Sequence, residues 1–339
     1  MKILLHGVHK KHYIYSGFSA NLGAKNLTSY LPYNYFVRHN DPFDISDSDG
    51  VLDRLDSFDL IVFNQRSFMD KNFKKILNCD TSAPKIFIDI EDDFFVRNIY
   101  HSPQIKYYIK RELYSHMDGS VMKTWMLKYL YGSYVYEVMR DSAPVSGSYS
   151  FPALPSFLAV QSSERKKLLP FSTTVEPVKV KPSTKKEYDL FYCCTVGNVP
   201  DRKKYYDILL GAQSRYQKAR MFVKPGGIPK DEFMKSVLSS KVGVSVRGGG
   251  FVANADWELP CYGVALLLQR RPLVVPWDHI DGKTALLFGS SDELFEKFEK
   301  YVLKSDEWKE IAKGGQKLYY AHHTPQKLIK EQVIDKVFK

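Results

Sequence analysis

Cysteine is scarce in this sequence. Only four of the 339 residues are cysteines, Cys79, Cys193, Cys194 and Cys261, and no two of them have C-x-x-C spacing. This pattern excludes a disulfide-rich scaffold and a zinc ribbon, and it fits a reducing compartment. We therefore expect a cytoplasmic protein whose cysteines are ordinary strand or core residues.

Long apolar runs are also missing. The longest candidate, residues 264–268, ends at a Gln-Arg-Arg triplet, far short of the roughly 20 apolar residues of a membrane-spanning helix. The apolar start at residues 1–8 is followed at once by a His-Lys-Lys triplet, so it is too short for the core of a signal peptide. We expect a soluble protein.

Charge of one sign does not dominate any segment either. The chain carries 49 Lys and Arg against 38 Asp and Glu, a net charge of +11, and the two signs are interleaved. This surplus favours an anionic partner: a nucleotide-linked substrate, a nucleic acid or an anionic membrane. The sequence has no zinc-finger, helix-turn-helix or RNA-recognition signature, so we place nucleic acid last.

What the sequence does contain is an alternation of short apolar runs and longer segments, which occurs in both halves of the chain. Short apolar runs occupy positions 3–5, 58–63 and 85–90, and then positions 189–194, 219–223, 242–246, 264–268 and 272–275. Short strands separated by longer helical segments are typical of a parallel sheet with crossover helices. We predict an α/β fold with two Rossmann-like domains facing each other across a cleft, with ligands bound beyond the carboxyl ends of the strands.

The length of the chain and a change in composition set the predicted domain boundaries. Ser, Pro and Lys accumulate over residues 142–183, which indicates an irregular connection. We predict an N-terminal domain over residues 1–170, a linker over 171–187 and a C-terminal domain over 188–325. A last helix over 326–339 is expected to pack back on the N-terminal domain.

Three helices can be placed in the second half. A basic helix should begin near Asp201, and a second should follow the capping box Ser290-x-x-Glu293. A third should start after Ser305 and pause at the Gly-Gly pair at positions 314–315. The second helix has an apolar stripe made of Leu294, Phe295, Phe298 and Val302.

A glycine-rich loop after the predicted strand at residues 242–246 is the first candidate site. Arg247 is followed by Gly248, Gly249 and Gly250, and Glu258 lies at a predicted helix start shortly after. Glycine backbone lets phosphate oxygens approach amide groups, and a guanidinium binds a diphosphate by charge-assisted hydrogen bonds. The loop matches neither a Walker motif nor G-x-G-x-x-G, and a flexible surface turn is the alternative interpretation.

Several ordered motifs now add a family resemblance. From about residue 188 onward the chain resembles the spore-maturation (CgeB-like) branch of group 1 glycosyltransferases, which have the GT-B fold. The first half resembles it more loosely, through an opening glycine loop, an Asp-Asp pair after a strand and Leu-Pro-Phe-Ser at 169–172. The stronger match rests on SSKVGV at 239–244, WELPCYGV at 257–264, SDEL at 291–294 and HTP at 323–325.

The resemblance implies roles for residues of the second half. Glu258 matches the glutamate that binds the ribose hydroxyls of a nucleotide-sugar donor; its alternative role is a helix-start residue stabilised by the helix dipole. Arg202, Lys224 and Arg247 are the candidates for binding the diphosphate, together with the amides of Gly248 and Gly249. Each of the three cations could instead be an ordinary solvated charge.

One position departs from the family pattern. Many retaining relatives carry a Glu-x7-Glu pair, but the residue eight positions before Glu258 is Gly250. The carboxylate that would face the donor sugar is therefore absent, and Asp256 is its only nearby substitute. Retention is slightly favoured because the group 1 relatives mostly retain, and inversion stays open.

Candidate catalytic residues in the first half are acids and histidines. Asp92 and Asp93, with Glu91 beside them, follow a predicted strand, and mutual repulsion can raise the pKa of one carboxyl toward that of a general base. His12 and His6 flank the first loop and could exchange protons near neutral pH. An acidic surface turn and structural histidines are the alternatives.

The expected activity is glycosyl transfer from a UDP- or GDP-sugar to a glycan, lipid or protein acceptor, with no metal and no other cofactor. The alternative is a non-catalytic protein that binds a sugar or nucleotide on a degenerate GT-B fold. Peripheral contact with a membrane stays open because residues 165–167 are basic. No nucleic acid partner is expected.

Overall fold

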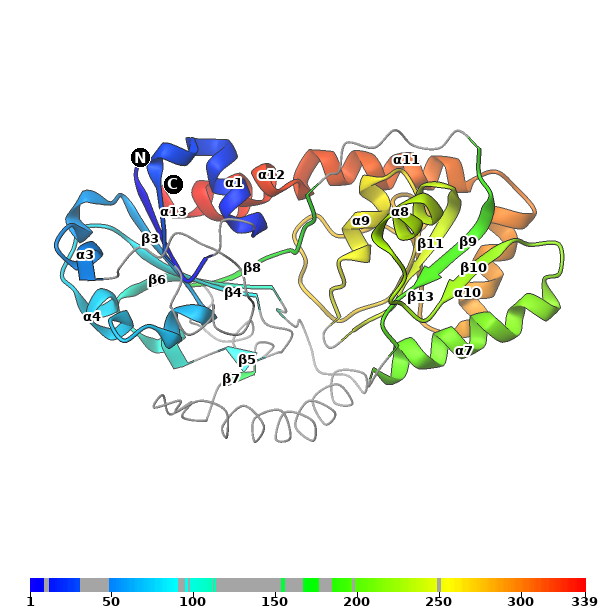
Figure 1. Cartoon of the computed structure of the whole chain (residues 1–339), viewed down its shortest axis with the longest axis horizontal. Coiled ribbons are helices and arrows are strands. Elements are labelled where there is room, and N and C mark those ends of the chain that lie inside the picture. The colour runs from blue at the N-terminus through cyan, green and yellow to red at the C-terminus, as the bar shows by residue number, and fades with distance from the viewer. Residues whose placement is uncertain are drawn as a thin grey trace. The chain divides into compact units, whose positions relative to one another are not determined.

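A computed structural model of the chain describes residues 1–8, 12–30, 49–90, 95–96, 98–111, 113, 154–155, 167–176, 185–196, 199–248 and 251–339. The chain forms two compact units, which are coloured along the chain in Figure 1. Unit 1 comprises Met1–Ser172, Pro272–Pro276 and Pro325–Lys339, and unit 2 comprises Thr173–Arg271 and Trp277–Thr324.

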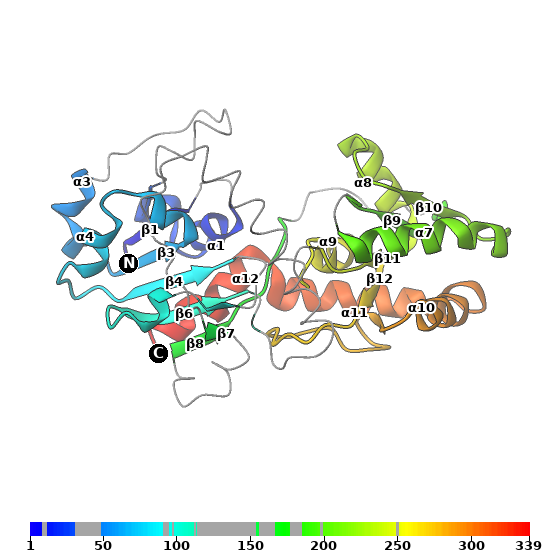
Figure 2. The same cartoon turned by 90° about the horizontal axis from the view of Figure 1, so that it is seen from below.

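Unit 1 is built on a six-stranded sheet in which every pair is parallel. In the sheet the strands follow the order β2 (Leu27–Tyr30), β1 (Ile3–His6), β3 (Leu60–Asn64), β4 (Lys85–Asp89), β6 (Ile105–Lys110) and β8 (Leu168–Pro170). Figure 2 shows β4, β6 and β8 in this sequence. Strands β5 (Phe95–Val96) and β7 (Leu154–Pro155) form a separate antiparallel pair.

Both faces of the unit 1 sheet are buried, because successive side chains of a strand point to opposite faces. Leu60 and Val62 of β3 belong to one apolar cluster, whereas Ile61 and Phe63 belong to the other. The first cluster takes in residues of α1 (Tyr13–Leu22) and α12 (Pro325–Ile329), and the second those of α3 (Asp49–Leu52) and α4 (Phe73–Asn78). Continuous apolar strands of this kind are the signature of a covered parallel sheet.

The last residues of the chain complete the first of these clusters. Helix α12, the π-helical turn η8 (Lys330–Ile334) and α13 (Asp335–Val337) follow one another beside α1 (Figure 1). Leu328, Ile329 and Val333 are fully buried there. Helix α1 approaches α12 closely at Gly17, where a Cβ atom would lie 2.9 Å from Cβ of Ile329 and would also meet the carbonyl oxygen of Pro325.

Unit 2 is built on a five-stranded parallel sheet. Its order is β10 (Met221–Lys224), β9 (Tyr188–Cys193), β11 (Ser240–Ser245), β12 (Ala265–Gln269) and β13 (Leu286–Phe288). The chain therefore leaves β9 toward one side of the sheet and reaches β11 on the other. The prediction of α/β architecture with two parallel sheets is confirmed.

Helices cover both faces of this second sheet. Figure 1 shows α7 (Pro200–Arg215) and α10 (Ser291–Phe298) on one face and α8 (Lys230–Leu238), α9 (Ala255–Cys261) and α11 (Trp308–Leu318) on the other. Tyr205 and Leu209 of α7 and Leu294 and Phe298 of α10 are buried against the strands. The π-helical turns η6 (Glu299–Leu303) and η7 (Tyr319–His323) continue α10 and α11. Short 3-10 turns in unit 1 complete the elements: η1 (Ala24–Asn26), η2 (Leu55–Ser57), η3 (Gln65–Met69) and η4 (Asn98–His101).

The predicted N-cap of α10 is confirmed, and the apolar stripe behind it is buried. Ser290 accepts a hydrogen bond from the backbone N–H of Glu293 at 3.2 Å. The carboxylate of Glu293 does not return to the N-cap residue; it accepts from the N–H of Gly289 at 2.8 Å and pairs with Arg270. Half of a capping box therefore forms, and an ion pair replaces the other half.

Two element predictions are wrong. Helix α11 does not pause at Gly314 and Gly315 but runs through both. Glycine is needed at these positions because a Cβ atom would collide with the carbonyl oxygen of Lys283 or Thr284. These glycines let a loop approach the helix and do not end it. Residues 272–275 form no strand with the unit 2 sheet; they lie in unit 1, where the N–H of Val274 donates to the carbonyl of Leu113 at 2.8 Å.

In the described part of the chain, no helix is both long enough and apolar enough to cross a bilayer.

We predict that Gly17→Ala destabilises the protein by about 1–3 kcal/mol, the usual cost of overpacking a tight contact. The added methyl group has to displace Ile329 or the backbone of α12. Urea unfolding followed by circular dichroism measures the change.

Gly211→Ala is the matched control, because Gly211 also lies inside a helix but has open space around it. Alanine there should raise the free energy of unfolding by about 0.5–1 kcal/mol through helix propensity. Equal effects of the two substitutions would contradict the close packing of α1 on α12.

Candidate functional site

The carboxyl edge of the unit 2 sheet is where a ligand site is expected. Strands β10 and β11 lie on either side of β9, so the connections after β9 and β11 leave the sheet in opposite directions, and in open α/β sheets ligands bind at such a point. Two segments border this point: the start of α7, which follows β9, and residues 246–248, which follow β11.

Arg202 and Gly248 meet at this point. A Cβ atom on Gly248 would lie 2.5 Å from Nη2 of Arg202, so only glycine allows the guanidinium to lie against the backbone there. Nη1 of Arg202 donates to the carbonyl of Thr195 at 3.5 Å, and its buried Nε has no hydrogen-bond partner in the described part of the chain. No carboxylate among those residues pairs with it, so Arg202 retains donor capacity and charge.

Arg247 has a different environment. Its Nε donates to the carboxylate of Asp201, and its guanidinium stacks over the ring of Phe251 with 5.0 Å between centres. The side-chain oxygen of Gln269 accepts from the backbone N–H of Arg247 at 3.0 Å, and Nε2 of Gln269 lies 3.4 Å from the carboxylate of Asp201. Asp201 thus neutralises Arg247, whose side chain is only 7% exposed, and the group fastens the β11 loop to α7 and β12.

Lys224 lies at the same edge, at the end of β10 opposite Cys193. Its side chain is exposed. The glycines after it allow a close approach, since Gly226 has φ of 90° and a Cβ there would lie 2.9 Å from the carbonyl of Cys194. The edge therefore carries Lys224 at the end of β10 and Arg202 in the first turn of α7.

Glu258 belongs to α9, which follows the β11 loop. Burial raises the pKa of this carboxyl, and the opposite charge of Lys230 at the start of α8 lowers it in part. No hydrogen bond or ion pair to the carboxylate occurs among the residues that the structure describes. A desolvated carboxylate of this kind is a ready acceptor for ligand hydroxyls.

Asp256, the alternative acidic candidate, is fully engaged inside the protein. Its Oδ1 accepts from the hydroxyl of Ser245 at 2.6 Å, and its Oδ2 accepts from the N–H of Ala253 at 3.2 Å and pairs with Arg271. Burial raises the pKa of Asp256, and Arg271 opposes that shift. With 1% of its surface exposed, the carboxylate of Asp256 holds the surrounding segments together and is not open to a ligand in this structure.

Helix α9 is held further by an aromatic stack. Trp257 stacks between His279 and His323, with ring centres 4.5 and 3.4 Å away. The Nε2 atoms of these histidines lie 3.0 Å from the carbonyl oxygens of Asp256 and Trp277. Since a carbonyl only accepts, Nε2 carries the proton in both rings, and the stack fixes the turn of helix that presents Glu258.

The two histidines predicted near the first loop have structural partners in unit 1. His12 is the N-cap of α1, where its Nδ1 accepts from the N–H of Ile14 at 3.3 Å. His6 is buried and its Nε2 lies 2.7 Å from the carboxylate of Asp70. A catalytic role for His12 stays a prediction, and Glu91, Asp92, Asp93, Gly249 and Gly250 lie outside the described residues.

Some residues of the edge could not be found from sequence. Asp201 and Gln269 reach Arg247 from 46 and 22 positions away, and no local pattern marks such a pair.

A buried polar group of unit 1 was likewise not predictable from the sequence. Lys110 donates to the buried carboxylate of Asp89 at 3.1 Å, and Tyr108 donates to the same oxygen. Buried polar residues inside apolar strands carry no periodic signal.

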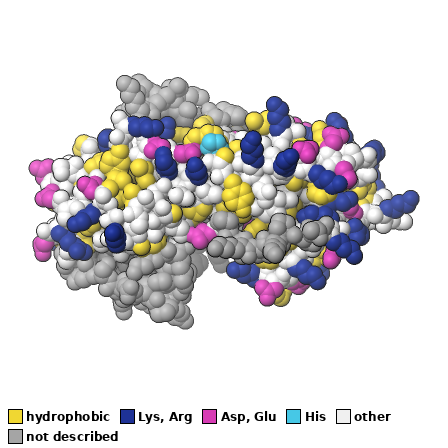
Figure 3. Space-filling view, turned by 90° about the horizontal axis from the view of Figure 1, so that it is seen from above, with side chains coloured by type: hydrophobic (Ala, Val, Ile, Leu, Met, Phe, Trp, Pro, Cys, Tyr) yellow, Lys and Arg dark blue, Asp and Glu magenta, His cyan; other side chains and the backbone are white. Residues whose placement is uncertain are grey.

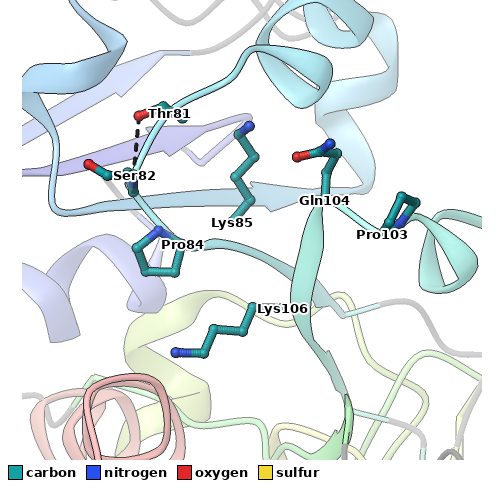
Figure 4. A pocket seen from close by; sticks show the side chains of 8 residues that line it. Thr81, Ser82, Pro84, Lys85, Pro103, Gln104 and Lys106 are labelled. Atoms are coloured by element: carbon teal, nitrogen blue, oxygen red, sulfur yellow. Dashed lines mark hydrogen bonds between the residues drawn. The ribbon is translucent and has the colours of Figure 1, made fainter.

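A cavity of about 420 Å³ lies elsewhere, at the amino ends of β4 and β6 in unit 1 (Figure 4). Its side chains include Lys85 and Lys106, whose ammonium groups donate to the carbonyls of Cys79 and Val337. Lys85 thereby caps the carboxyl end of α4. Among the residues described here, no cluster of three or more His, Cys, Asp or Glu is arranged to hold a metal ion.

We predict that His279 and His323 each make the protein less stable as the pH drops from about 6.5 toward 4. Burial lowers the pKa of His279 to about 4 and of His323 to about 3, whereas unfolded histidine takes up its proton near 6.5. In that interval the unfolded chain binds more protons than the folded one, so each histidine removes about 1.4 kcal/mol per pH unit. Urea unfolding at a series of pH values measures the slope.

His323→Gln should flatten this slope by the contribution of one histidine, and the same substitution at the exposed His101 should leave it unchanged. Identical slopes for the wild type and His323→Gln would show that His323 is not held neutral.

Comparison with known proteins identifies the fold. No protein-family model and no curated protein matches the sequence. The structure is similar to that of HepE from Anabaena in complex with UDP, with a TM-score of 0.54 and 11% identity over 99% of this chain and 100% of HepE. It is also similar to a glycosyltransferase from Rickettsia africae, with a TM-score of 0.53 and 9% identity over 99% of this chain and 97% of that one. Two parallel-sheet α/β units with these likenesses give the chain the fold of the GT-B glycosyltransferases.

Proposed function

We propose that the protein is a glycosyltransferase that uses a nucleotide diphosphate sugar as donor. Two lines of evidence support this proposal. The first is the fold, which is similar to that of HepE, a protein solved with UDP and with UDP-glucose. The second is the carboxyl edge of unit 2, where Arg202 lies against the backbone of Gly248 and Glu258 supplies a desolvated carboxylate. The CgeB-like branch is the group whose motifs the second half resembles.

The observation that carries the proposal is the contact of Arg202 with the backbone of Gly248. A guanidinium that pairs with no carboxylate of the described residues, at the point where the β9 and β11 connections diverge, suits a diphosphate. Lys224 adds a second cation from the end of β10, and the amides of Gly248 and Gly249 complete the set we propose. Arg247 is the weaker candidate, because Asp201 already neutralises it.

We assign the ribose hydroxyls to Glu258. Its carboxylate has two acceptor oxygens and no partner in the described part of the chain, and two adjacent hydroxyls satisfy both oxygens at once. The stack of Trp257 with two histidines keeps α9 in place, so the carboxylate is positioned before the donor arrives.

The chemistry follows from where charge develops. As the bond between the anomeric carbon and the diphosphate breaks, negative charge grows on the leaving group, and Arg202 and Lys224 stabilise it without a metal. Removing one well-placed donor of this kind costs about 10²–10³-fold in rate. In the retaining mechanism that we favour, the leaving phosphate takes the proton of the acceptor hydroxyl; in an inverting one, Asp92 or Asp93 takes it.

The acceptor and the setting are further parts of the proposal. We propose a glycan or glycoconjugate acceptor, a cytoplasmic location and, for a lipid-linked acceptor, peripheral contact with a membrane. Nucleic acid is disfavoured, because Lys and Arg are scattered among acidic and apolar side chains on the face in Figure 3 and form no continuous stripe there. A binding protein without turnover is the second candidate, since Asp256 is engaged and position 250 is glycine.

A thermal-shift screen with UDP, GDP, ADP, CMP and their sugar conjugates, with and without EDTA, tests the proposal. A ligand at 100 times its dissociation constant stabilises the fold by about 2.7 kcal/mol. We expect one nucleotide to raise the melting temperature, and EDTA to leave the shift unchanged. Binding without sugar transfer to any acceptor would favour the non-catalytic alternative, and no shift at all would contradict the proposal.

Arg202→Ala should weaken binding of that nucleotide by at least about tenfold, because a charged hydrogen-bond donor to phosphate is worth about 1.5–3 kcal/mol. Arg215→Ala is the matched control, since Arg215 lies on the same helix with its side chain 68% exposed. Isothermal titration calorimetry measures both, and equal affinities would remove Arg202 from the site.

Glu258→Gln should weaken binding of the ribonucleoside diphosphate and leave that of its 2′-deoxy analogue less affected, because the lost interaction is with the ribose hydroxyls. Glu310→Gln, at an exposed position of α11, is the control. If Glu258→Gln weakens both nucleotides equally, the carboxylate does not bind the ribose.

A further inference from the structure

Trp277 adopts a backbone conformation that its side chain disfavours. Its φ is 50°, and it is the one residue other than glycine with positive φ in the described part of the chain. It follows Pro276 in a turn, at a position where glycine or asparagine is usual. A bulky residue in the left-handed region is held there by its surroundings, and such positions concentrate at functional sites.

The surroundings fix both the backbone and the ring of Trp277. His323 donates from Nε2 to the carbonyl oxygen of Trp277 at 3.0 Å. The indole lies flat on the ring of His322, with ring centres 4.6 Å apart and 2° between the planes. Even so, 41% of the residue is exposed, and its indole N–H makes no hydrogen bond to the residues described.

The next residue adds a fixed hydrogen-bond acceptor. Oδ1 of Asp278 accepts from Arg271 at 2.7 Å and from the N–H of His279 at 2.7 Å, while Oδ2 has no partner among the described residues. Arg271 is itself buried, and its other nitrogen pairs with Asp256. Asp278 is therefore anchored to the interior while 36% of its side chain stays exposed.

We propose that Trp277 and Asp278 form a binding site for a pyranose ring, the sugar of an acceptor glycan. The axial C–H groups of a pyranose carry partial positive charge and pack on the electron-rich face of an indole. Its hydroxyls donate to Oδ2 of Asp278 and accept from the indole N–H. The choice of a glycan as occupant rests on the proposed function.

Charge separates a sugar from other flat or apolar ligands. The carboxylate of Asp278 repels the phosphate of a nucleotide and the headgroups of an anionic bilayer, whereas it accepts hydrogen bonds from a neutral polyol. A rigid, half-exposed tryptophan beside a carboxylate oxygen that has no partner among the described residues therefore suits a sugar ring better than a nucleobase or a membrane surface.

Saturation-transfer difference NMR with the methyl glycosides of glucose, galactose and N-acetylglucosamine tests the site. Signals should appear for at least one glycoside with the wild-type protein and should fall with Trp277→Gly, weakening binding by about tenfold as for loss of an aromatic stacking partner. Glycine takes positive φ without strain, so this variant keeps the backbone and removes only the ring.

Trp277→Phe keeps an aromatic face and should retain most of the signal. Tyr320→Ala is the matched control, because Tyr320 is an aromatic residue of the same unit that is 49% exposed; it should leave the signal unchanged. No glycoside signal with the wild type, or an equal signal with Trp277→Gly, overturns the proposal. Trp277-dependent sedimentation with phosphatidylglycerol vesicles overturns it too, in favour of a membrane contact.

The UDP thermal shift, measured on the same preparations, separates this proposal from the one on which it rests. A glycoside signal that depends on Trp277 without any nucleotide shift would mean that the donor function fails and the sugar site stands. A nucleotide shift without a glycoside signal would mean the reverse.

Discussion

The buried carboxylate of Asp256 is the interaction on which the rest of the site depends. A carboxylate with 1% of its surface exposed is tolerated only when its lone pairs are occupied. Here the partners come from the end of β11, from the loop before α9 and from the segment after β12, so a single acid ties three parts of the chain together. Arg271 pairs with both Asp256 and Asp278. Asp256 therefore helps to hold both Glu258, two residues after it in α9, and the turn at Trp277, next to Asp278.

Two neighbouring arginines show how pairing inside the protein separates structural from ligand-binding cations. Arg247 lies where a glycine-rich loop begins, yet Asp201 neutralises it. Arg202, one position after that aspartate, contacts a glycine and pairs with no acid among the residues that the structure describes. Both are arginines at the edge of one sheet, and only the second keeps the charge and donors that an anionic ligand requires.

Much of the fold could be read from the apolar runs, since buried parallel strands are continuous in apolar residues; the runs at 58–63, 85–90 and 242–246 correspond to β3, β4 and β11. The helix prediction failed at Gly314 and Gly315, because the contact that requires glycine there is with a loop 31 positions away. For the same reason the distant partners of Arg247 were not predictable. Pairing across long sequence separations depends on the three-dimensional arrangement, and no local pattern encodes it.

The contribution of residues 325–339 to unit 1 has a consequence for the order of folding. Ribosomal synthesis delivers unit 2 before these residues, and Leu328, Ile329 and Val333 fill the face of the unit 1 sheet next to α1. Until they emerge, that face exposes apolar surface, which is the state in which nascent chains aggregate. Unit 1 therefore begins to form first and is completed last, and a fragment that ends at residue 172 would leave one face of its sheet covered by α1 without α12 and the residues after it.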